Sequence, residues 1–265
     1  MLPAVWRRRM PLTEQKLLDG KAALITGASR NLGAAIAETL AEQGATVAVN
    51  YLHTNPETSG LMNRLRAQGK PAYAIPGDMA VPGDVRMMVN QALEVFDGHV
   101  DILVNNAGPF NADPFATLTE VEWDRIMNIN LKAAYLTAQG TAPGMRAAGW
   151  GRIVNIGAGS AYIRNHGIYG LAKGALMLLT EQLALELGPE IMVNAVAPGQ
   201  IMESAPDISQ IDPTFVDRAI THSPARRLVT RSEVAHLVAW LCSPAADLIT
   251  GHTIPADGGW RLNRF

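Results

Sequence analysis

The sequence predicts an α/β fold in which one parallel β-sheet is covered by helices on both faces. Two observations predict it: short apolar, β-branched segments alternate with longer segments of helical period, and the first short segment runs into a glycine turn. The chain has 265 residues, of which 48% are apolar, so it can bury one large core. Neither a repeat period nor a low-complexity linker divides the sequence, and we therefore expect a single domain.

Seven segments are expected to form the strands, because each is short, mostly apolar and bounded by turn residues or by a helical segment. In chain order they are Ala22–Thr26, Thr46–Asn50, Ala72–Pro76, Ile102–Asn105, Arg152–Ile156, Ile191–Val196 and His252–Pro255. Such runs of apolar residues are typical of parallel strands that are buried on both faces.

Six longer segments carry apolar residues every three or four positions and are expected to be helices. In chain order they are Leu32–Gln43, Glu57–Ala67, Asp84–Phe96, Glu120–Ala147, Ile168–Leu187 and Ser232–Leu241. The segment Gln200–Pro224 breaks the alternation, because it contains three prolines and has no strong strand pattern. We expect it to form either a mobile lid over the site or irregular surface structure.

The first 18 residues are expected to be a poorly ordered extension, followed by the single domain over residues 19–265. The basic run Arg7–Arg9 precedes a polar segment that lacks the apolar core of a secretion signal. No apolar run reaches about 18 residues, so the sequence predicts no membrane span.

Charge and cysteine content restrict the partners. The net charge of −2 is spread along the chain, so no basic surface for nucleic acid or an anionic membrane is expected, and a small molecule is the expected partner. Cys242 is the single cysteine, which excludes an intrachain disulfide and a thiolate-rich metal site. The six histidines show no metal-ligand spacing, so we expect no catalytic metal. A single cysteine fits a reducing compartment, and the expected localisation is cytoplasmic.

A glycine-containing turn joins the first expected strand to the first expected helix. It reads Thr26-Gly27-Ala28-Ser29-Arg30-Asn31-Leu32-Gly33-Ala34. Free backbone N–H groups and the helix dipole make the start of such a helix an anion site, here suited to a pyrophosphate. The sequence therefore predicts a doubly wound, dinucleotide-binding Rossmann fold.

Further motifs follow in order: Asp78 after the third strand, Asn105-Asn106-Ala107-Gly108 at the end of the fourth, Asn130, and Tyr169-Gly170-Leu171-Ala172-Lys173. With the glycine turn, these motifs resemble the short-chain dehydrogenase/reductase family over about residues 19–260. The resemblance includes β-ketoacyl-acyl-carrier-protein reductases and related alcohol dehydrogenases. The family loop reads Thr-Gly-x-x-x-Gly-x-Gly, and Asn31 occupies the place of its middle glycine. Asparagine tolerates positive φ, so cofactor binding can survive this change with adjusted geometry.

The pair Tyr169 and Lys173 carries the expected chemistry. A spacing of four residues places both side chains on one helix face, where the ammonium should lower the pKa of the tyrosine from about 10 towards working pH. In the direction of reduction Tyr169 would be the general acid, while the cofactor delivers hydride. The resemblance further implies that Lys173 holds the nicotinamide ribose and that Asn130 positions a water that relays protons to Lys173.

The resemblance also implies the cofactor-binding residues, which are Gly27, Ser29, Arg30, Asn31, Leu32, Gly33, Tyr51, His53, Asp78, Met79, Asn106, Ala107, Gly108, Tyr169, Lys173, Pro198, Gly199 and Ile201. NADP(H) is favoured over NAD, because an acid at the end of the second strand would bind a free ribose hydroxyl and none occurs before Glu57. Arg30 matches a position that contacts the 2′-phosphate in NADP-dependent relatives, and His53 lies where another base often stands.

Two positions depart from the family pattern. Ala158 stands where the family has a serine that binds the substrate oxygen, and the loop before Tyr169 is two residues short. Ser160 is the nearest hydroxyl: it either replaces that serine as a catalytic residue or is an ordinary turn residue. Glu203 stands where the family often has a threonine for the carboxamide, and Ser204 can take that role.

The sequence thus predicts an NADP(H)-dependent carbonyl reductase or alcohol dehydrogenase with a small-molecule carbonyl or alcohol substrate. A homotetramer is the family expectation, with an interface on the helices that begin at Glu120 and Ile168. Two alternatives stay open: a pterin or imine reductase, and a degenerate NADP-binding sensor or scaffold. Apolar candidates for the substrate pocket are Phe110, Tyr162, Ile163, Met202 and Trp260.

Overall fold

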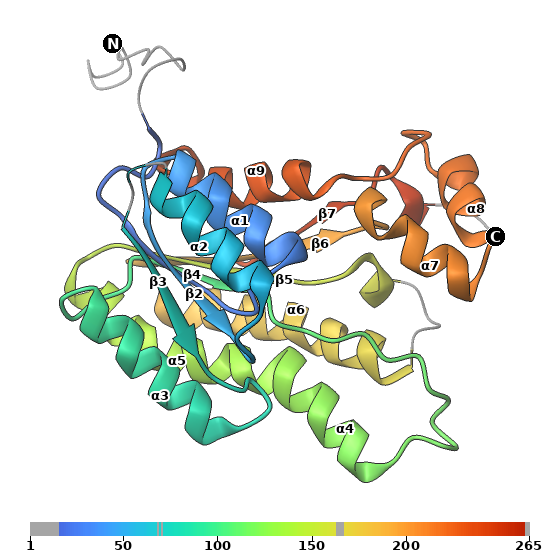
Figure 1. Ribbon diagram of the computed structural model, residues 1–265, viewed down its shortest axis with the longest axis horizontal. Helices are drawn as coiled ribbons and strands as arrows, with labels where there is room; N and C mark the ends of the chain where they lie inside the picture. The colour runs from blue at the N-terminus through green and yellow to red at the C-terminus, as the bar shows by residue number, and fades with distance from the viewer. Residues whose placement is uncertain (1–15, 68, 70, 163–166, 263–265) are drawn as a thin grey trace.

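A computed structural model shows a seven-stranded parallel sheet with helices on both faces (Figure 1), which confirms the predicted fold class. It describes residues 16–262 except 68, 70 and 163–166, so most of the expected N-terminal extension lies outside the described residues. The strand order is β3-β2-β1-β4-β5-β6-β7, and the order reverses between β1 and β4. In doubly wound sheets, ligands bind at the carboxyl ends of the strands beside such a reversal.

The strands lie within about two residues of the predicted segments at either end. They are β1 (Ala22–Ile25), β2 (Thr46–Tyr51), β3 (Ala72–Pro76), β4 (Ile102–Asn105), β5 (Gly151–Ile156), β6 (Ile191–Pro198) and β7 (Thr253–Ala256). The registers align the carboxyl ends of the central strands: Ile25 is paired with Val104, and Asn105 with Asn155. The loops that follow these strands therefore emerge at one edge of the sheet.

Two layers of helices sandwich the sheet. One layer consists of α1 (Asn31–Glu42), α2 (Pro56–Ala67) and α9 (Arg231–Leu241), whose apolar residues share one core with the sheet. The other contains α3 (Pro82–Val95), α5 (Ala133–Ala147) and α6 (Gly167–Leu187), which pack on the opposite face (Figure 1). The apolar strands are covered from both sides, as parallel strands require.

The predicted single helix Glu120–Ala147 is wrong in one respect. The structure divides it into α4 (Glu120–Met127), a π-helical turn η2 (Asn128–Lys132) and α5. The turn contains Asn130, whose side-chain amide donates to the carbonyl oxygens of Ile126 (3.1 Å) and Pro109 (3.2 Å). π-turns inside helices occur frequently at functional sites, and the apolar periodicity did not reveal this one.

The segment Gln200–Pro224 is helical rather than irregular. It contains η4 (Met202–Ser204), α7 (Ala205–Ile211) and α8 (Phe215–His222), which lie beyond the carboxyl ends of β6 and β7. Pro206 lies in the first turn of α7, where the missing N–H removes no helical hydrogen bond, and Pro213 separates the two helices. The prolines thus mark helix boundaries here. Among the described residues, no helix is both long and apolar enough to cross a membrane.

Candidate active site

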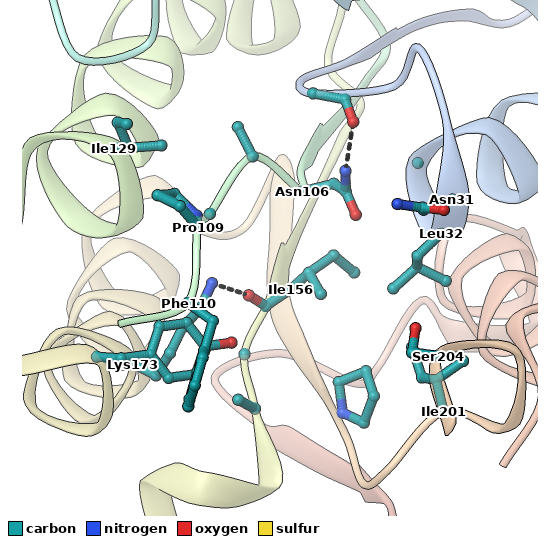
Figure 2. Close-up of a pocket in the computed structure, with 18 of the residues that line it drawn as sticks. Asn31, Leu32, Asn106, Pro109, Phe110, Ile129, Ile156, Lys173, Ile201 and Ser204 are labelled. Atoms are coloured by element: carbon teal, nitrogen blue, oxygen red, sulfur yellow. Dashed lines mark hydrogen bonds between the residues drawn. The ribbon is translucent and has the colours of Figure 1, made fainter. Parts of the chain in front are cut away.

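One cavity of about 1030 Å³ opens at the carboxyl ends of β1, β4, β5 and β6, where the strand order reverses (Figure 2). Its walls come from the glycine turn, from the loops after β2 to β6, from α4 and α6, and from α7, α8 and the C-terminal segment. It is large enough to take a ligand of dinucleotide size.

Two asparagines hold the glycine turn. Asn106, directly after β4, donates from its side-chain amide to the carbonyl oxygens of Thr26 (3.0 Å) and Gly27 (2.9 Å), and Figure 2 shows one of these bonds. The buried Asn50 on β2 accepts from the Gly27 N–H at 3.1 Å and donates to the Gly77 carbonyl at 3.1 Å. The conformation of the turn is therefore determined by side chains from both neighbouring strands.

The start of α1 is built to receive an anion. Its N-cap residue, Arg30, makes no side-chain capping bond, and no acidic residue lies in the first turn. Asn31, Leu32 and Gly33 line the cavity at this point. Uncapped N–H groups together with the helix dipole attract a phosphate, so these residues fit the pyrophosphate of a dinucleotide.

Asn31 and Gly33 meet different backbone requirements. Asn31 has a φ of 53°, which is a left-handed conformation. Glycine adopts this conformation freely and asparagine tolerates it, so asparagine can take the place of the family's middle glycine. A Cβ on Gly33 would lie 2.6 Å from both the Asn106 amide nitrogen and the Gly27 carbonyl oxygen. No other residue fits at position 33 without displacing Asn106, and Asn106 is one of the residues that hold the turn.

The end of β2 contributes Tyr51 and Leu52 to the cavity wall. Arg30 lines the same region, whereas His53 is exposed and is not among the lining residues. The structure therefore brings Arg30, but not His53, into the cavity.

The other predicted cofactor residues also line the cavity: Gly27, Ser29, Asp78, Met79, Asn106, Ala107, Gly108, Tyr169, Lys173, Pro198, Gly199 and Ile201. They come from five separate segments of the chain. The aligned ends of the parallel strands are what bring them together.

Tyr169 and Lys173 lie one turn apart at the start of α6. The Lys173 ammonium donates to the Ile156 carbonyl oxygen at 2.8 Å (Figure 2) and lies 5.7 Å from the centre of the Tyr169 ring. Burial raises the pKa of Tyr169 to about 12 and lowers the pKa of Lys173 to about 8. The expectation that the pKa of Tyr169 is lowered is therefore wrong for this structure, because desolvation by burial is the cause that shifts the pKa of each group.

Asn130 and Lys173 approach each other beside Gly108. A Cβ on Gly108 would lie 2.4 Å from Asn130 Oδ1 and 2.9 Å from Lys173 Nζ. Asn130 Oδ1 is buried and has no hydrogen-bond partner among the described residues. Since a buried polar atom normally has a partner, this geometry suits a bridging water between the amide oxygen and the ammonium.

The two positions that depart from the family pattern have different surroundings. Ala158 lines the cavity with a methyl group, while Ser160 lies in the short helix η3 (Gly159–Tyr162) and its side chain is outside what the structure describes. Glu203 accepts hydrogen bonds from the Arg231 N–H at 3.2 Å and so caps the first residue of α9. Ser204 lines the cavity in its place.

The cavity end near Tyr169 is mostly apolar. The Phe110 ring packs edge-on against Tyr169 at 5.1 Å, and Phe215 packs edge-on against Trp260 at 6.0 Å. Of the expected pocket residues, Phe110 and Trp260 line the cavity, whereas Tyr162 and the exposed Met202 do not. Ile163 lies outside the described residues.

Sequence reasoning missed several lining residues, including Asn50, Arg125, Ile208, Asp212 and Phe215. Asn50 interrupts an apolar strand, and a polar residue at such a buried position was a usable signal. Arg125 is an ordinary helix residue in the sequence. The other three belong to α7, to α8 and to the turn between them, which had not been predicted as helices.

Comparison with known proteins places this geometry in a family. The family model described as enoyl-(acyl carrier protein) reductase matches residues 27–261. The chain is 33% identical to versicolorin reductase from Emericella nidulans, covering 94% of this chain and 99% of that protein. It is 35% identical to 3-oxoacyl-[acyl-carrier-protein] reductase from Staphylococcus aureus, covering 90% of this chain and 97% of that protein.

Solved structures agree with this placement. A gluconate 5-dehydrogenase from Burkholderia cenocepacia, in complex with NADP and tartrate, has a TM-score of 0.86 at 31% identity, covering 94% of this chain and 98% of that one. A 7α-hydroxysteroid dehydrogenase complexed with NADH and 7-oxo glycochenodeoxycholic acid has a TM-score of 0.87 at 31% identity, with the same coverage. A short-chain type dehydrogenase/reductase from Mycobacterium marinum has a TM-score of 0.83 at 32% identity, covering 95% and 99%. The chain belongs to the short-chain dehydrogenase/reductase family of oxidoreductases.

Proposed function

We propose that this chain is an NADP(H)-dependent carbonyl reductase or alcohol dehydrogenase in which Tyr169 exchanges the proton with the substrate oxygen. The observation that carries the proposal is the shared cavity: Tyr169 and Lys173 line the same space as the uncapped start of α1. A relative that is a 3-oxoacyl-[acyl-carrier-protein] reductase and a structural neighbour bound to NADP support it.

Different groups would bind the different phosphates of the cofactor. The N–H groups at the start of α1 would bind the pyrophosphate, and Arg30 would bind a 2′-phosphate. No acidic residue follows β2 before Glu57, which removes the usual partner of a free ribose hydroxyl. When bound, the nicotinamide supplies or accepts the hydride.

The proton chemistry belongs to Tyr169, Lys173 and Asn130. Because the pKa of Tyr169 is about 12, its hydroxyl is protonated at neutral pH, as a general acid in carbonyl reduction must be. Its lost proton would be replaced from Lys173, whose pKa of about 8 lies close to working pH. Asn130 Oδ1 would orient the water that recharges the lysine.

A panel of ketones, aldehydes and 3-oxoacyl thioesters, followed by NADPH absorbance, tests the proposal. We expect turnover with at least one apolar carbonyl compound, and Tyr169→Phe should abolish it while leaving NADPH binding in place. Binding of NADPH without turnover of any carbonyl would instead indicate a cofactor-binding sensor or scaffold.

Reduction of a pterin or an imine is the second candidate. It is favoured by Ala158, which offers a methyl group where a carbonyl oxygen would need a second donor. Asp212 also lines the cavity, but its carboxylate is ion-paired to Arg218 at 2.7 Å, so the pair adds no net charge that would attract a protonated imine, and the candidate rests on Ala158. Turnover of dihydropterins or cyclic imines, but of no ketone, would establish this candidate.

The cofactor preference has its own test. We expect a lower KM for NADPH than for NADH, and Arg30→Ala should remove most of this preference by raising the KM for NADPH alone. A wild-type preference for NADH would refute the assignment of NADP.

A homotetramer in the cytoplasm is the proposed working form. The side chains of Leu171, Leu178 and Leu185 repeat every seven residues along α6 and are 49%, 67% and 81% exposed. Such a stripe lies on one helix face and is typical of an interface. Light scattering of the purified protein checks the mass, and Leu178→Glu with Leu185→Glu should reduce it.

A further inference from the structure

Arg125 is a cavity residue that no step of the proposed chemistry uses. It lies on α4 one turn before Ile129, and both side chains line the cavity. Asp78 and Met79, from the loop after β3, line the same cavity. Attraction to Asp78 is one of the causes that keep the pKa of Arg125 above its ordinary value, after its hydrogen bond and its attraction to Glu122. Arg125 and Asp78 therefore belong to one electrostatic environment.

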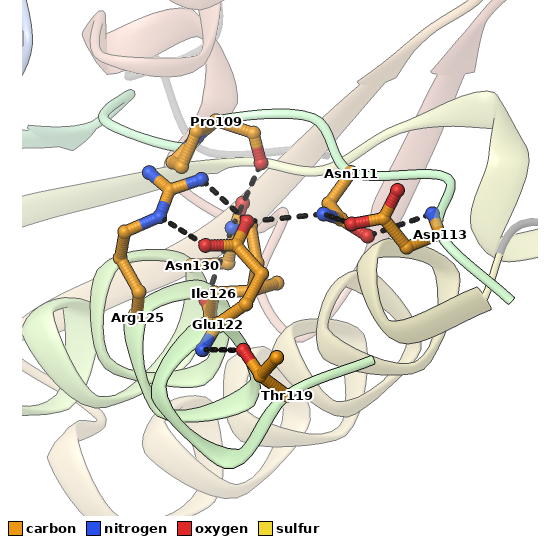
Figure 3. A network of polar contacts seen from close by, with 8 residues as sticks. All are labelled: Pro109, Asn111, Asp113, Thr119, Glu122, Arg125, Ile126 and Asn130. Atoms are coloured by element: carbon orange, nitrogen blue, oxygen red, sulfur yellow. Dashed lines mark hydrogen bonds and ion pairs between the residues drawn. The ribbon is translucent and has the colours of Figure 1, made fainter. Parts of the chain in front are cut away.

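Glu122 holds the guanidinium of Arg125 in one orientation (Figure 3). Arg125 Nε and Nη2 each donate to a different carboxylate oxygen of Glu122, both at 2.7 Å. Glu122 in turn accepts from the Asn111 amide at 3.0 Å, and its backbone N–H is capped by Thr119 at 3.2 Å. This paired geometry immobilises a planar group at the cavity wall.

The third guanidinium nitrogen, Nη1, is turned away from Glu122 in Figure 3. Within the part of the chain that the structure describes, Nη1 has no acceptor, and the Arg125 side chain is 42% exposed. Arg125 therefore offers a flat face and one free donor edge. The guanidinium stays charged, but Glu122 balances that charge, so the pair attracts a phosphate less than a free arginine would, while its flat face can still contact a neutral aromatic ring.

Other residues that line the same cavity complement such a ring. Asp78 uses one carboxylate oxygen to accept from the Ala80 N–H at 2.8 Å, and no donor among the described residues contacts the other, which can accept from an amino group. Met79 and Ile129 add apolar surface. An acceptor for an amino group, apolar side chains and a guanidinium plane together match a purine that carries an exocyclic amine.

We propose that Arg125, oriented by Glu122, recognises the adenine of the dinucleotide through cation–π contact and its free donor edge, opposite Asp78. The inference rests on the proposed function, because it requires that a dinucleotide binds in this cavity. It adds a residue to cofactor recognition and predicts that Arg125 contributes equally to NADP and NAD binding.

Calorimetric binding of NADPH, NADH and reduced nicotinamide mononucleotide, which has no adenine, tests this inference. We expect Arg125→Met to raise the Kd for NADPH and NADH alike by about tenfold, or about 1.4 kcal/mol, and to leave the mononucleotide unchanged. The double variant Glu122→Gln with Arg125→Met should behave in the same way, which excludes an effect of the orphaned carboxylate. Arg146→Met is the matched control, because Arg146 is exposed, ion-paired to Glu190 and remote from the cavity lining.

Three results would overturn the inference: unchanged affinity for both dinucleotides, a loss confined to NADPH, or an equal loss for the mononucleotide. A loss confined to NADPH would assign Arg125 to the 2′-phosphate. If the unmodified protein bound neither dinucleotide, the proposed function would fail and this inference with it. If it bound both and Arg125→Met had no effect, only the inference on Arg125 would fail.

Discussion

Gly108 is the position where adding one methyl group should separate the members of the proton-transfer site. Its Cβ would lie 2.4 Å from Asn130 Oδ1 and 2.9 Å from Lys173 Nζ, distances that real Cβ atoms essentially never show. Neither neighbour can yield cheaply. Asn130 is held by its two carbonyl acceptors and Lys173 by the Ile156 carbonyl, and both side chains are buried.

The expected size of the effect follows from these contacts. Overpacking costs about 1–3 kcal/mol, and loss of a charged hydrogen bond costs about 1.5–3 kcal/mol. If the neighbours move, the hydrogen bond is lost but the overpacking is relieved, so the two costs do not add in full. We therefore expect Gly108→Ala to lower the free energy of unfolding by about 2–4 kcal/mol. At about 2–4 °C per kcal/mol, the Tm should fall by about 5–15 °C. The value of kcat should fall at least tenfold, because displacing Lys173 or Asn130 needs to raise the activation free energy by only about 1.4 kcal/mol for that effect.

Thermal unfolding and NADPH oxidation, measured on the same preparation, check this prediction. The matched control is Gly83→Ala in the first turn of α3, where a Cβ would meet nothing within 4 Å. Alanine at that position should raise stability by up to about 1 kcal/mol and leave kcat unchanged. The reasoning is refuted if Gly108→Ala keeps both the Tm and the kcat of the unmodified protein.

Three further predictions concern stability. Burial lowers the pKa of Lys173 to about 8 from an ordinary value of 10.5, so the unfolded chain binds more protons between these pH values and the folded protein gains stability as pH rises through them. Lys173→Met should therefore be more stable than the unmodified protein at pH 7. The gain from removing the buried charge is on the order of 3 kcal/mol, from which the lost hydrogen bond must be subtracted. The difference in Tm between the two proteins should be smaller at pH 9.5, and a difference that is constant with pH contradicts the lowered pKa of Lys173. Asn31→Ala should cost about 1 kcal/mol because of its φ of 53°, whereas Asn31→Gly should cost little; equal Tm values for the two variants would argue against strain at this position. Glu203→Ala should cost up to about 1 kcal/mol by removing the acceptor of the Arg231 N–H, while the Thr230–Glu233 capping box of α9 remains, and an unchanged Tm would show that this hydrogen bond contributes nothing.

Local pattern was sufficient for much of the fold. The glycine turn and the apolar strands predicted the sheet, its parallel direction and the position of the cavity, because buried parallel strands need apolar side chains and a pyrophosphate needs free N–H groups. The α7–α8 segment was misjudged. Its prolines are equally compatible with loops and with first helical turns, and only the packing of these helices over the cavity distinguishes the two.

Within the site, too, the sequence predicted some features and not others. The spacing of Tyr169 and Lys173 predicted that both side chains would lie on one helix face, and in the structure both line the cavity. It led to the prediction of a lowered pKa for Tyr169, which is the wrong direction, because the shift depends on desolvation by residues remote in sequence. The π-turn at Asn130 was also hidden, since apolar periodicity continues through it.

The sequence by itself determined the order of the elements, the family and the residues able to do the chemistry, because these depend on residue type and short spacing. Only the tertiary structure decided that Glu203 hydrogen-bonds the first residue of a distant helix, that His53 stays outside the cavity, and that Arg125 lies in the cavity wall. Each of these facts depends on which distant segments meet in space. Burial, electrostatic partners and pKa values arise from such long-range contacts, which short sequence spacing does not encode.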